Sequence, residues 1–334
     1  MQVAKYWKKE GGKIRCTLCP NMCLLQNGEW GGCRNRKAVD GQLHSMVYGE
    51  PCAVNTDPVE KKPLYHFMPG SKTFSVGTAG CNLACKNCQN ASISQVTPDE
   101  VPHYNLSPEK LVDMAERQGS KIIAYTYTEP VTFIEYVYDT ATIARKRGIK
   151  NVIVTAGYIN KAPLLDLVPV IDAANIDLKS FDDNVYKDLN AGRLSVILRT
   201  IEILKEQGVW LELTYLIVPQ WSDDEQMIRN MCRWMVDNGM QDVPLHFSRF
   251  FPTYQLIHLP PTPEKVMQRA WQIAAEEGLH YVFLGNMPAT GKEHSFCPSC
   301  GKPVIRRGGF AVKENVMSGG KCLHCGEAIA GVWS

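Results

Sequence analysis

The chain has 334 residues, of which 45% are hydrophobic and 21% are charged, and its formal net charge at pH 7 is +2. This composition is ordinary for a globular protein, and the length allows one large domain or two to three small ones. The nearly balanced charge excludes the strong field of a nucleic-acid-binding or membrane-surface protein. The basic N-terminus has no apolar core and no run of about 18 apolar residues occurs, so we expect a cytoplasmic protein with no membrane partner.

Thirteen cysteines are many for a chain in a reducing compartment, where clustered cysteines bind metal more often than they form disulfides. Cys232 lies in an amphipathic helix pattern and is expected to be a buried apolar side chain. Cys52 either does the same or adds a ligand to the first of three groups. The groups are Cys16, Cys19, Cys23 and Cys33; Cys81, Cys85 and Cys88; and Cys297, Cys300, Cys322 and Cys325.

The first group lies in an N-terminal segment, residues 1–71, with the spacing Cys-x2-Cys-x3-Cys-x9-Cys. Four thiolates satisfy a tetrahedral zinc ion, and they equally satisfy an auxiliary iron–sulfur cluster. The spacing does not separate these options from a set of thiols without metal. We favour zinc because nothing here is similar to a ferredoxin repeat. Residues 56–71 contain three prolines and a Pro-Gly turn, which predicts an ordered connector.

Strand and helix patterns alternate in the central segment, residues 72–290. This alternation predicts an α/β fold with a parallel sheet wrapped by helices. A closed eight-fold barrel and a doubly wound sheet are less favoured, because only about six strand–helix steps stand out. Strands are predicted over 72–77, 121–127, 151–155, 175–178, 209–218, 243–247 and 279–284, and helices over 108–118, 131–147, 161–167, 194–206, 223–237 and 263–277.

Three cysteines follow the first of these strands, with the spacing Cys-x3-Cys-x2-Cys at Cys81, Cys85 and Cys88. Three thiolates on one tight loop can ligate three irons of a cubane [4Fe–4S] cluster, which leaves the fourth iron open to a small molecule. The carboxyl end of a strand is where such barrels hold their chemistry. Spacing alone indicates a metal site, and a structural cysteine cluster or part of a zinc site is the alternative.

The spacing and the preceding strand resemble the radical S-adenosylmethionine (SAM) superfamily. The resemblance implies a partial (β/α)6 barrel whose open iron binds the amino and carboxylate groups of SAM. An electron from the cluster then splits SAM into methionine and a 5′-deoxyadenosyl radical. Many members carry an aromatic residue before the third cysteine, whereas this chain has Asn87. Adenine packing is therefore expected from Tyr125, Tyr127 or Trp221.

Polar residues at the other strand ends are candidate SAM contacts by position in this resemblance. Glu129 stands where members hold the SAM amino group with a Gly-Gly-Glu motif, although residues 127–129 lack the two glycines. Its alternative is an acid favoured by a helix N-terminus. Lys179 would pair with the SAM carboxylate, and its alternative is a surface ion pair. A lone histidine such as His246 is equally well structural. The set is Glu129, Thr155, Asp177, Lys179, His246 and Asn286.

The C-terminal segment, residues 291–334, contains two matching Cys-x2-Cys-Gly knuckles at 297–301 and 322–326. Two such knuckles are typical of a zinc ribbon, and iron is the less favoured alternative. A short hairpin is predicted between them over 303–313. The segment is mildly basic but has no aromatic platform, so we expect a structural cap or partner-docking module and no nucleic-acid partner.

Over nearly its whole length the chain is similar to AmmeMemoRadiSam-system radical SAM enzymes, which are relatives of pyruvate formate-lyase activating enzymes. The resemblance implies an oxidoreductase with catalytic cluster ligands Cys81, Cys85 and Cys88 and a reductant such as flavodoxin or ferredoxin. The substrate is unidentified, and an open barrel would admit a protein, as in glycyl-radical-enzyme activation. The alternatives are a small-molecule or peptide-modifying oxidoreductase with an auxiliary metal site and a non-catalytic metal-binding scaffold. The matching blocks are 57–67, 80–94, 127–129, 246–252 and both cysteine-rich ends.

Overall fold

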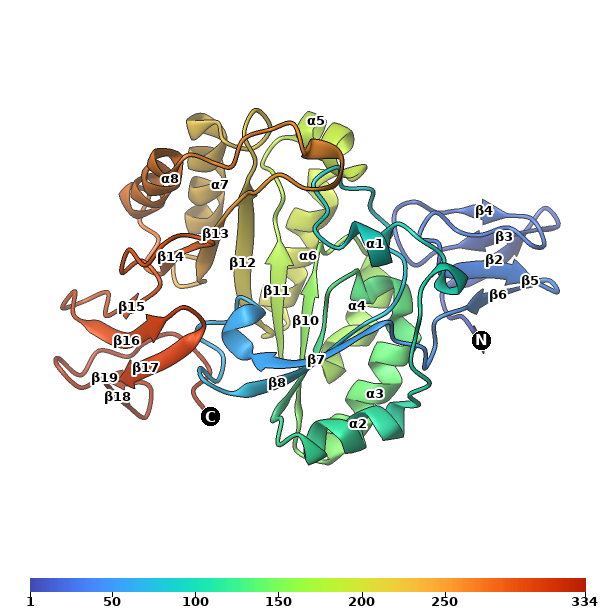
Figure 1. The fold of residues 1–334 in the computed structure, drawn as a ribbon, viewed down its shortest axis with the longest axis horizontal. Helices are drawn as coiled ribbons and strands as arrows, with labels where there is room; N and C mark the ends of the chain where they lie inside the picture. The colour runs from blue at the N-terminus through green and yellow to red at the C-terminus, as the bar shows by residue number, and fades with distance from the viewer.

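The computed structural model describes all residues from Met1 to Ser334. An eight-stranded sheet forms its centre, in the order β14-β13-β12-β11-β10-β9-β8-β7 (Figure 1). The strands from β8 to β14 run parallel and follow chain order. They are β8 (Lys72–Gly77), β9 (Ile122–Tyr125), β10 (Lys150–Thr155), β11 (Ala173–Asp177), β12 (Trp210–Ile217), β13 (Leu245–Arg249) and β14 (Val282–Gly285).

This arrangement confirms the predicted α/β fold with a parallel sheet. The sheet is open, because β14 and β7 are its two edges, so the closed barrel is wrong. The strand order never reverses, so the doubly wound sheet is also wrong. None of the helices combines the length and the apolarity that a membrane span requires.

Helices connect the parallel strands close to the predicted positions. The first long helix begins as expected from its sequence, since the Ser107 side chain accepts a hydrogen bond from the Lys110 amide and Pro108 occupies the first turn. The helix expected from residue 131 begins instead with a 3-10 turn over Pro130–Phe133. The main helices are α2 (Pro108–Arg117), α3 (Ile134–Lys146), α4 (Lys161–Leu167), α6 (Leu194–Glu206), α7 (Glu225–Asp237) and α8 (Glu264–Glu276); α1 (Ala91–Ser94) and α5 (Asp183–Val185) are single turns.

One edge of the sheet was not predicted. Strand β7 (Ala53–Pro58) pairs antiparallel with β8, so the expected connector over residues 56–71 begins as a strand. Polar residues on its outer side and the proline at its end hide the strand pattern in the sequence. The sheet therefore starts at Ala53, before the predicted boundary at residue 72, and the division into domains 1–71, 72–290 and 291–334 stays a prediction.

The N-terminal residues form two small antiparallel sheets that share the hydrophobic core of the central sheet and its helices. Ile14, Leu18 and Leu25 belong to the main buried hydrophobic cluster. Arg36 is buried and its Nη2 lies 2.5 Å from the Glu135 carboxylate on α3. This contact fixes the segment to the barrel. The strands are β1 (Gln2–Val3), β2 (Trp7–Glu10), β3 (Lys13–Cys16), β4 (Leu24–Leu25), β5 (Arg36–Val39) and β6 (Gln42–Ser45).

The C-terminal module, residues 291–334, lies at the opposite end of the molecule from the N-terminal sheets (Figure 1). It packs against β14, where Phe283 joins Val304 and Ile329 in one buried cluster. Arg307 is buried 3.7 Å from the Glu60 carboxylate, which belongs to the segment after β7. Its strands are β15 (Ser295–Phe296), β16 (Pro303–Gly308), β17 (Ala311–Asn315), β18 (Met317–Ser318) and β19 (Lys321–Cys322), and the predicted hairpin is β16–β17.

His66 lies in this interface and is uncharged there. Its Nδ1 lies 2.8 Å from the Ala330 carbonyl, which can only accept, so Nδ1 carries the proton and Nε2 accepts from the Ser295 hydroxyl at 2.8 Å. Complete burial lowers the pKa of His66 to about 4. The folded state therefore resists a proton that the unfolded chain accepts near pH 6.5.

We expect the interface to weaken as pH falls from about 6.5 to about 4, because only the unfolded chain gains the His66 proton over that range. The lost stability is about 3 kcal/mol at 1.36 kcal/mol per pKa unit. Urea unfolding at a series of pH values would measure it, with His66→Gln as the control that removes this titration. Parallel stability curves for the two chains would contradict the expectation.

Candidate active site and metal centres

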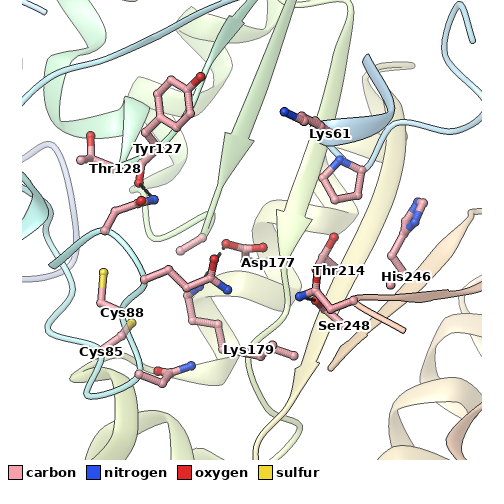
Figure 2. A pocket seen from close by; sticks show the side chains of 18 of the residues that line it. Lys61, Cys85, Cys88, Tyr127, Thr128, Asp177, Lys179, Thr214, His246 and Ser248 are labelled. Atoms are coloured by element: carbon pink, nitrogen blue, oxygen red, sulfur yellow. Dashed lines mark hydrogen bonds and ion pairs between the residues drawn. The ribbon is translucent and has the colours of Figure 1, made fainter. Parts of the chain in front are cut away.

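A cavity of about 360 Å³ opens at the carboxyl end of the parallel strands. This volume lies within the range of pockets that hold small molecules and cofactors. Cys85 and Cys88, on the loop after β8, face the cavity from one side, and His246 of β13 faces it from the other (Figure 2). Cys81 also lines it. The loop predicted to bind a cluster therefore stands where the barrel leaves room for a ligand.

The cysteine loop is shaped by a close approach behind it. Gly80 has a φ of +89°, and a Cβ there would lie 2.3 Å from the Cys33 carbonyl oxygen. Within the loop, the Leu83 amide donates to Cys81 Sγ at 3.5 Å and Asn190 Nδ2 donates to Cys85 Sγ at 3.2 Å. Donors that face sulfur support thiolate ligands in iron–sulfur sites. The three residues thus fit the ligands of a cluster.

Lys179 and Asp177 lie together on the cavity wall at the end of β11 (Figure 2). Lys179 Nζ is 3.1 Å from Asp177 Oδ2. Burial acts to lower the pKa of Lys179, but the Asp177 and Cys85 charges raise it above its usual range. The lysine is therefore a fixed cation inside the cavity, which suits an anionic ligand group.

Glu129 also lines the cavity, but its carboxylate already has partners in the chain. It accepts hydrogen bonds from the Val131 amide at 3.1 Å, the Thr155 hydroxyl at 2.5 Å and the Ala156 amide at 2.9 Å. These bonds join the ends of β9 and β10. Thr155, predicted as a SAM contact, does not line the cavity and instead holds Glu129. Burial raises the pKa of Glu129.

The backbone just before Glu129 adopts a glycine-like conformation although it contains no glycine. Tyr127 has a φ of +69°, the left-handed conformation that normally favours glycine. Asn90 Nδ2 donates to the Tyr127 carbonyl at 2.6 Å and holds this conformation against the cysteine loop. Of the three aromatic residues expected to pack against adenine, Tyr127 lines the cavity, whereas Tyr125 and Trp221 do not. The prediction that Tyr125 packs against adenine is wrong, because its ring is buried within the hydrophobic core.

His246 lines the cavity and is held by a residue that the sequence reasoning missed. Its Nε2 lies 2.6 Å from Glu212 Oε2, on the neighbouring strand β12. Glu212 also accepts from the backbone amides of Tyr65 and His66 at 2.8 and 2.7 Å. Burial acts to raise the pKa of Glu212, but His246 and these donors lower it. The available signal was a lone acid in an otherwise apolar strand, residues 210–217.

Asn286 completes the predicted set on the far wall of the cavity. It has a φ of +57° just after β14, and its Nδ2 donates to Ser248 Oγ at 3.0 Å. The lining residues that were not predicted include two from outside the parallel strands and their loops. Lys61 comes from the segment after β7, and Phe310 comes from the turn of the β16–β17 hairpin. The C-terminal module therefore contributes directly to the cavity wall.

The C-terminal cysteines form a compact group with the spacing of a single metal ion. Cys297 and Cys325 sulfurs are 3.6 Å apart, and those of Cys300 and Cys322 are 3.9 Å apart. A tetrahedral zinc with bonds of about 2.3 Å places its sulfurs about 3.8 Å apart. Burial acts to raise the pKa of Cys322, but nearby amides lower it to about 7. The group is consistent with a zinc-ribbon-like metal site.

Cys232 and Cys52 lie outside the three cysteine groups. Cys232 is fully buried in the hydrophobic core, as predicted. Cys52 does not line the cavity of the N-terminal cysteines, and its sulfur lies 3.7 Å from the Gly77 carbonyl oxygen. It is therefore not an added ligand of that group.

Residues 75–232 match the family model of the radical SAM superfamily. An uncharacterised protein of Methanocaldococcus jannaschii is 42% identical over 326 residues, which are 97% of this chain and 97% of that protein. The pyruvate formate-lyase 1-activating enzyme of Escherichia coli K12 is 25% identical over 222 residues, 61% of this chain and 89% of the enzyme. Residues 75–232 are therefore identified as a radical SAM domain.

The solved structures support the fold alone. Streptococcus suis SuiB bound to S-adenosylmethionine matches with a TM-score of 0.50 and 14% identity, over 72% of this chain and 56% of that chain. A radical SAM domain implies a [4Fe–4S] cluster and SAM as cofactors, and enzymes with this domain are in general oxidoreductases.

Proposed function

We propose that this chain is a radical SAM oxidoreductase, similar to the activating enzymes, that abstracts a hydrogen atom from a bulky substrate. The observation that carries the proposal is the meeting of Cys81, Cys85 and Cys88 with the cation of Lys179 in one cavity of about 360 Å³. The cluster and SAM, when bound, supply reductive cleavage of SAM and the radical that abstracts hydrogen.

The residues of the chain would divide the binding work. Cys81, Cys85 and Cys88 would ligate three irons, and Lys179 would hold the SAM carboxylate by charge. Glu129, with its carboxylate oriented by Thr155 and two amides, would receive the SAM amino group, which is bonded to the same α-carbon as the carboxylate. His246, oriented by Glu212, and Asn286 would line the wall beyond Lys179.

We further assign the chain to the AmmeMemoRadiSam-system enzymes. The support is the block from Asp57 to Phe67, which lies beside the cavity, together with the cysteine-rich ends of the chain. A protein substrate, a flavodoxin or ferredoxin as reductant and zinc at the C-terminal cysteines belong to the same proposal. Lys61 and Phe310 line the cavity and are also exposed to solvent, so such a substrate would contact them on binding.

Production of 5′-deoxyadenosine tests the proposal. The protein would be reconstituted with iron and sulfide without oxygen and given SAM and dithionite. We expect product from the parent and from Cys52→Ala, a control outside every cysteine group, and none from Cys85→Ala. Absence of product from a parent with an intact, reducible cluster would contradict the proposal and favour the metal-binding scaffold.

A further inference from the structure

The three cysteine groups differ in how closely their sulfurs approach one another. The four C-terminal sulfurs all lie within 4.8 Å of one another, and no set of three potential ligands elsewhere in the chain is that compact. The loop of Cys81, Cys85 and Cys88 is therefore wider than a zinc site. Wider spacing is expected of a cubane cluster, because each thiolate binds a different iron.

The sulfurs of the N-terminal group are widely spaced, like those of Cys81, Cys85 and Cys88, and are not compact like those of the C-terminal group. One small cavity of about 10 Å³ is lined by Cys16, Cys19, Cys23 and Cys33, but no three of their sulfurs lie within 4.8 Å of one another. That cavity is about the space of one water-sized sphere. Sulfurs that bind one zinc ion at about 2.3 Å leave no such space between them. The C-terminal cysteines line neither this cavity nor the larger one at the strand ends.

The surroundings of the cavity also suit a buried cluster. Cys16, Cys19 and Cys33 are buried and only Cys23 is partly exposed, with Leu18 and Leu25 among the lining residues. The Gly32 amide donates to Cys23 Sγ at 3.5 Å. A low exposure with amides near sulfur is how proteins hold iron–sulfur clusters.

This cavity touches the back of the loop that carries Cys81. Asn82 lines it, and Asn82 directly follows Cys81, whose Cα is about 3.8 Å away along the chain. Asn21 Nδ2 donates to the Asn82 carbonyl at 2.9 Å, and Asn35 Nδ2 donates to the Ala79 carbonyl at 3.0 Å. The two cysteine sites therefore lie back to back across one turn of chain.

We propose that Cys16, Cys19, Cys23 and Cys33 bind an auxiliary [4Fe–4S] cluster, and not the zinc ion that their sequence spacing favours. With four thiolates the cluster is fully ligated, so none of its irons is open to SAM. Such a cluster exchanges single electrons, and its place behind Cys81 puts it beside the SAM-binding site.

Iron and zinc counts on the full chain after anaerobic reconstitution test this proposal. We expect about eight irons per chain in the parent and in a Cys52→Ser control, and about four in each of two variants. One variant carries Cys81→Ala, Cys85→Ala and Cys88→Ala, and the other carries Cys19→Ser and Cys23→Ser. Electron paramagnetic resonance of the reduced triple variant should show a [4Fe–4S] signal that SAM leaves unchanged.

The triple variant alone decides the outcome if the Cys19→Ser, Cys23→Ser variant fails to fold. A triple variant that holds no iron overturns the proposal, whether it contains extra zinc at the N-terminal cysteines or no metal there. A signal that shifts when SAM is added overturns full ligation by four thiolates. None of these readings depends on SAM turnover, so failure of the proposed function would be seen separately.

Discussion

Replacing Arg307 with leucine is expected to destabilise the chain by about 3–5 kcal/mol, because the change leaves the Glu60 carboxylate buried without its partner. Both side chains are completely buried, and the ion pair spans 3.7 Å between the C-terminal module and the segment after β7. Arg307 also donates to the Tyr65 carbonyl at 2.7 Å and to Ser295 Oγ at 3.0 Å. The substitution therefore removes several links between the module and the barrel at once.

The neighbouring residue supplies a matched control for this prediction. Arg306 pairs with Glu314 at 3.0 Å, but both side chains are at least half exposed. Arg306→Leu should change stability by no more than about 0.5 kcal/mol. Urea unfolding of the two variants would compare them, and adding Glu60→Gln to Arg307→Leu should restore part of the loss. Equal destabilisation by the two arginine changes would show that burial of the pair is not the cause.

Replacing Glu129 with glutamine is expected to raise the KM for SAM by about 10-fold to 100-fold. A hydrogen bond to a charged group contributes about 1.5–3 kcal/mol, and the amide removes that charge. Glutamine also places an NH₂ group against donors, since both carboxylate oxygens of Glu129 accept hydrogen bonds within the chain. The variant should therefore lose SAM affinity and some stability together.

A second variant separates the binding role of Glu129 from its structural role. Thr155→Val removes the hydroxyl that donates to Glu129 but keeps the carboxylate charge in the cavity. If Glu129 holds the SAM amino group, this variant should lose stability with a much smaller rise in KM. The rate of 5′-deoxyadenosine formation at a series of SAM concentrations gives the KM of both variants, and urea unfolding gives their stability. A Glu129→Gln variant with the KM of the parent would refute the assignment.

The central sheet could be predicted because its strands are apolar runs separated by amphipathic helices. The strand from Ala173 to Asp177 and the helix from Leu194 to Glu206, for example, lie close to their predicted positions. The N-terminal strands could not be predicted in this way. They are two to four residues long, and β2 reads Trp-Lys-Lys-Glu, so they carry no period that a sequence reveals. Their stability comes from packing against the barrel.

The same difference between local patterns and long-range contacts decides which parts of the site could be predicted. The spacing of Cys81, Cys85 and Cys88 is local, so the sequence alone could show it. The bond between His246 and Glu212 joins two strands, and Phe310 reaches the cavity only because the module docks on the barrel. The left-handed turn at Tyr127 is also hidden, because no glycine marks it. Contacts between segments that are far apart in the chain have no fixed sequence spacing, so the sequence alone does not predict them.

The position of Phe310 has a consequence for measurements of affinity. The same hairpin that presents Phe310 to the cavity lies between the two cysteine knuckles of the C-terminal module. If the knuckles bind a metal that orders this hairpin, a molecule that contacts Phe310 in the cavity would be thermodynamically linked to that metal. If metal binding tightens that molecule's affinity by some factor, the molecule tightens the metal's affinity by the same factor. Substrate titrations on metal-depleted protein would then report a different affinity from those on the intact chain.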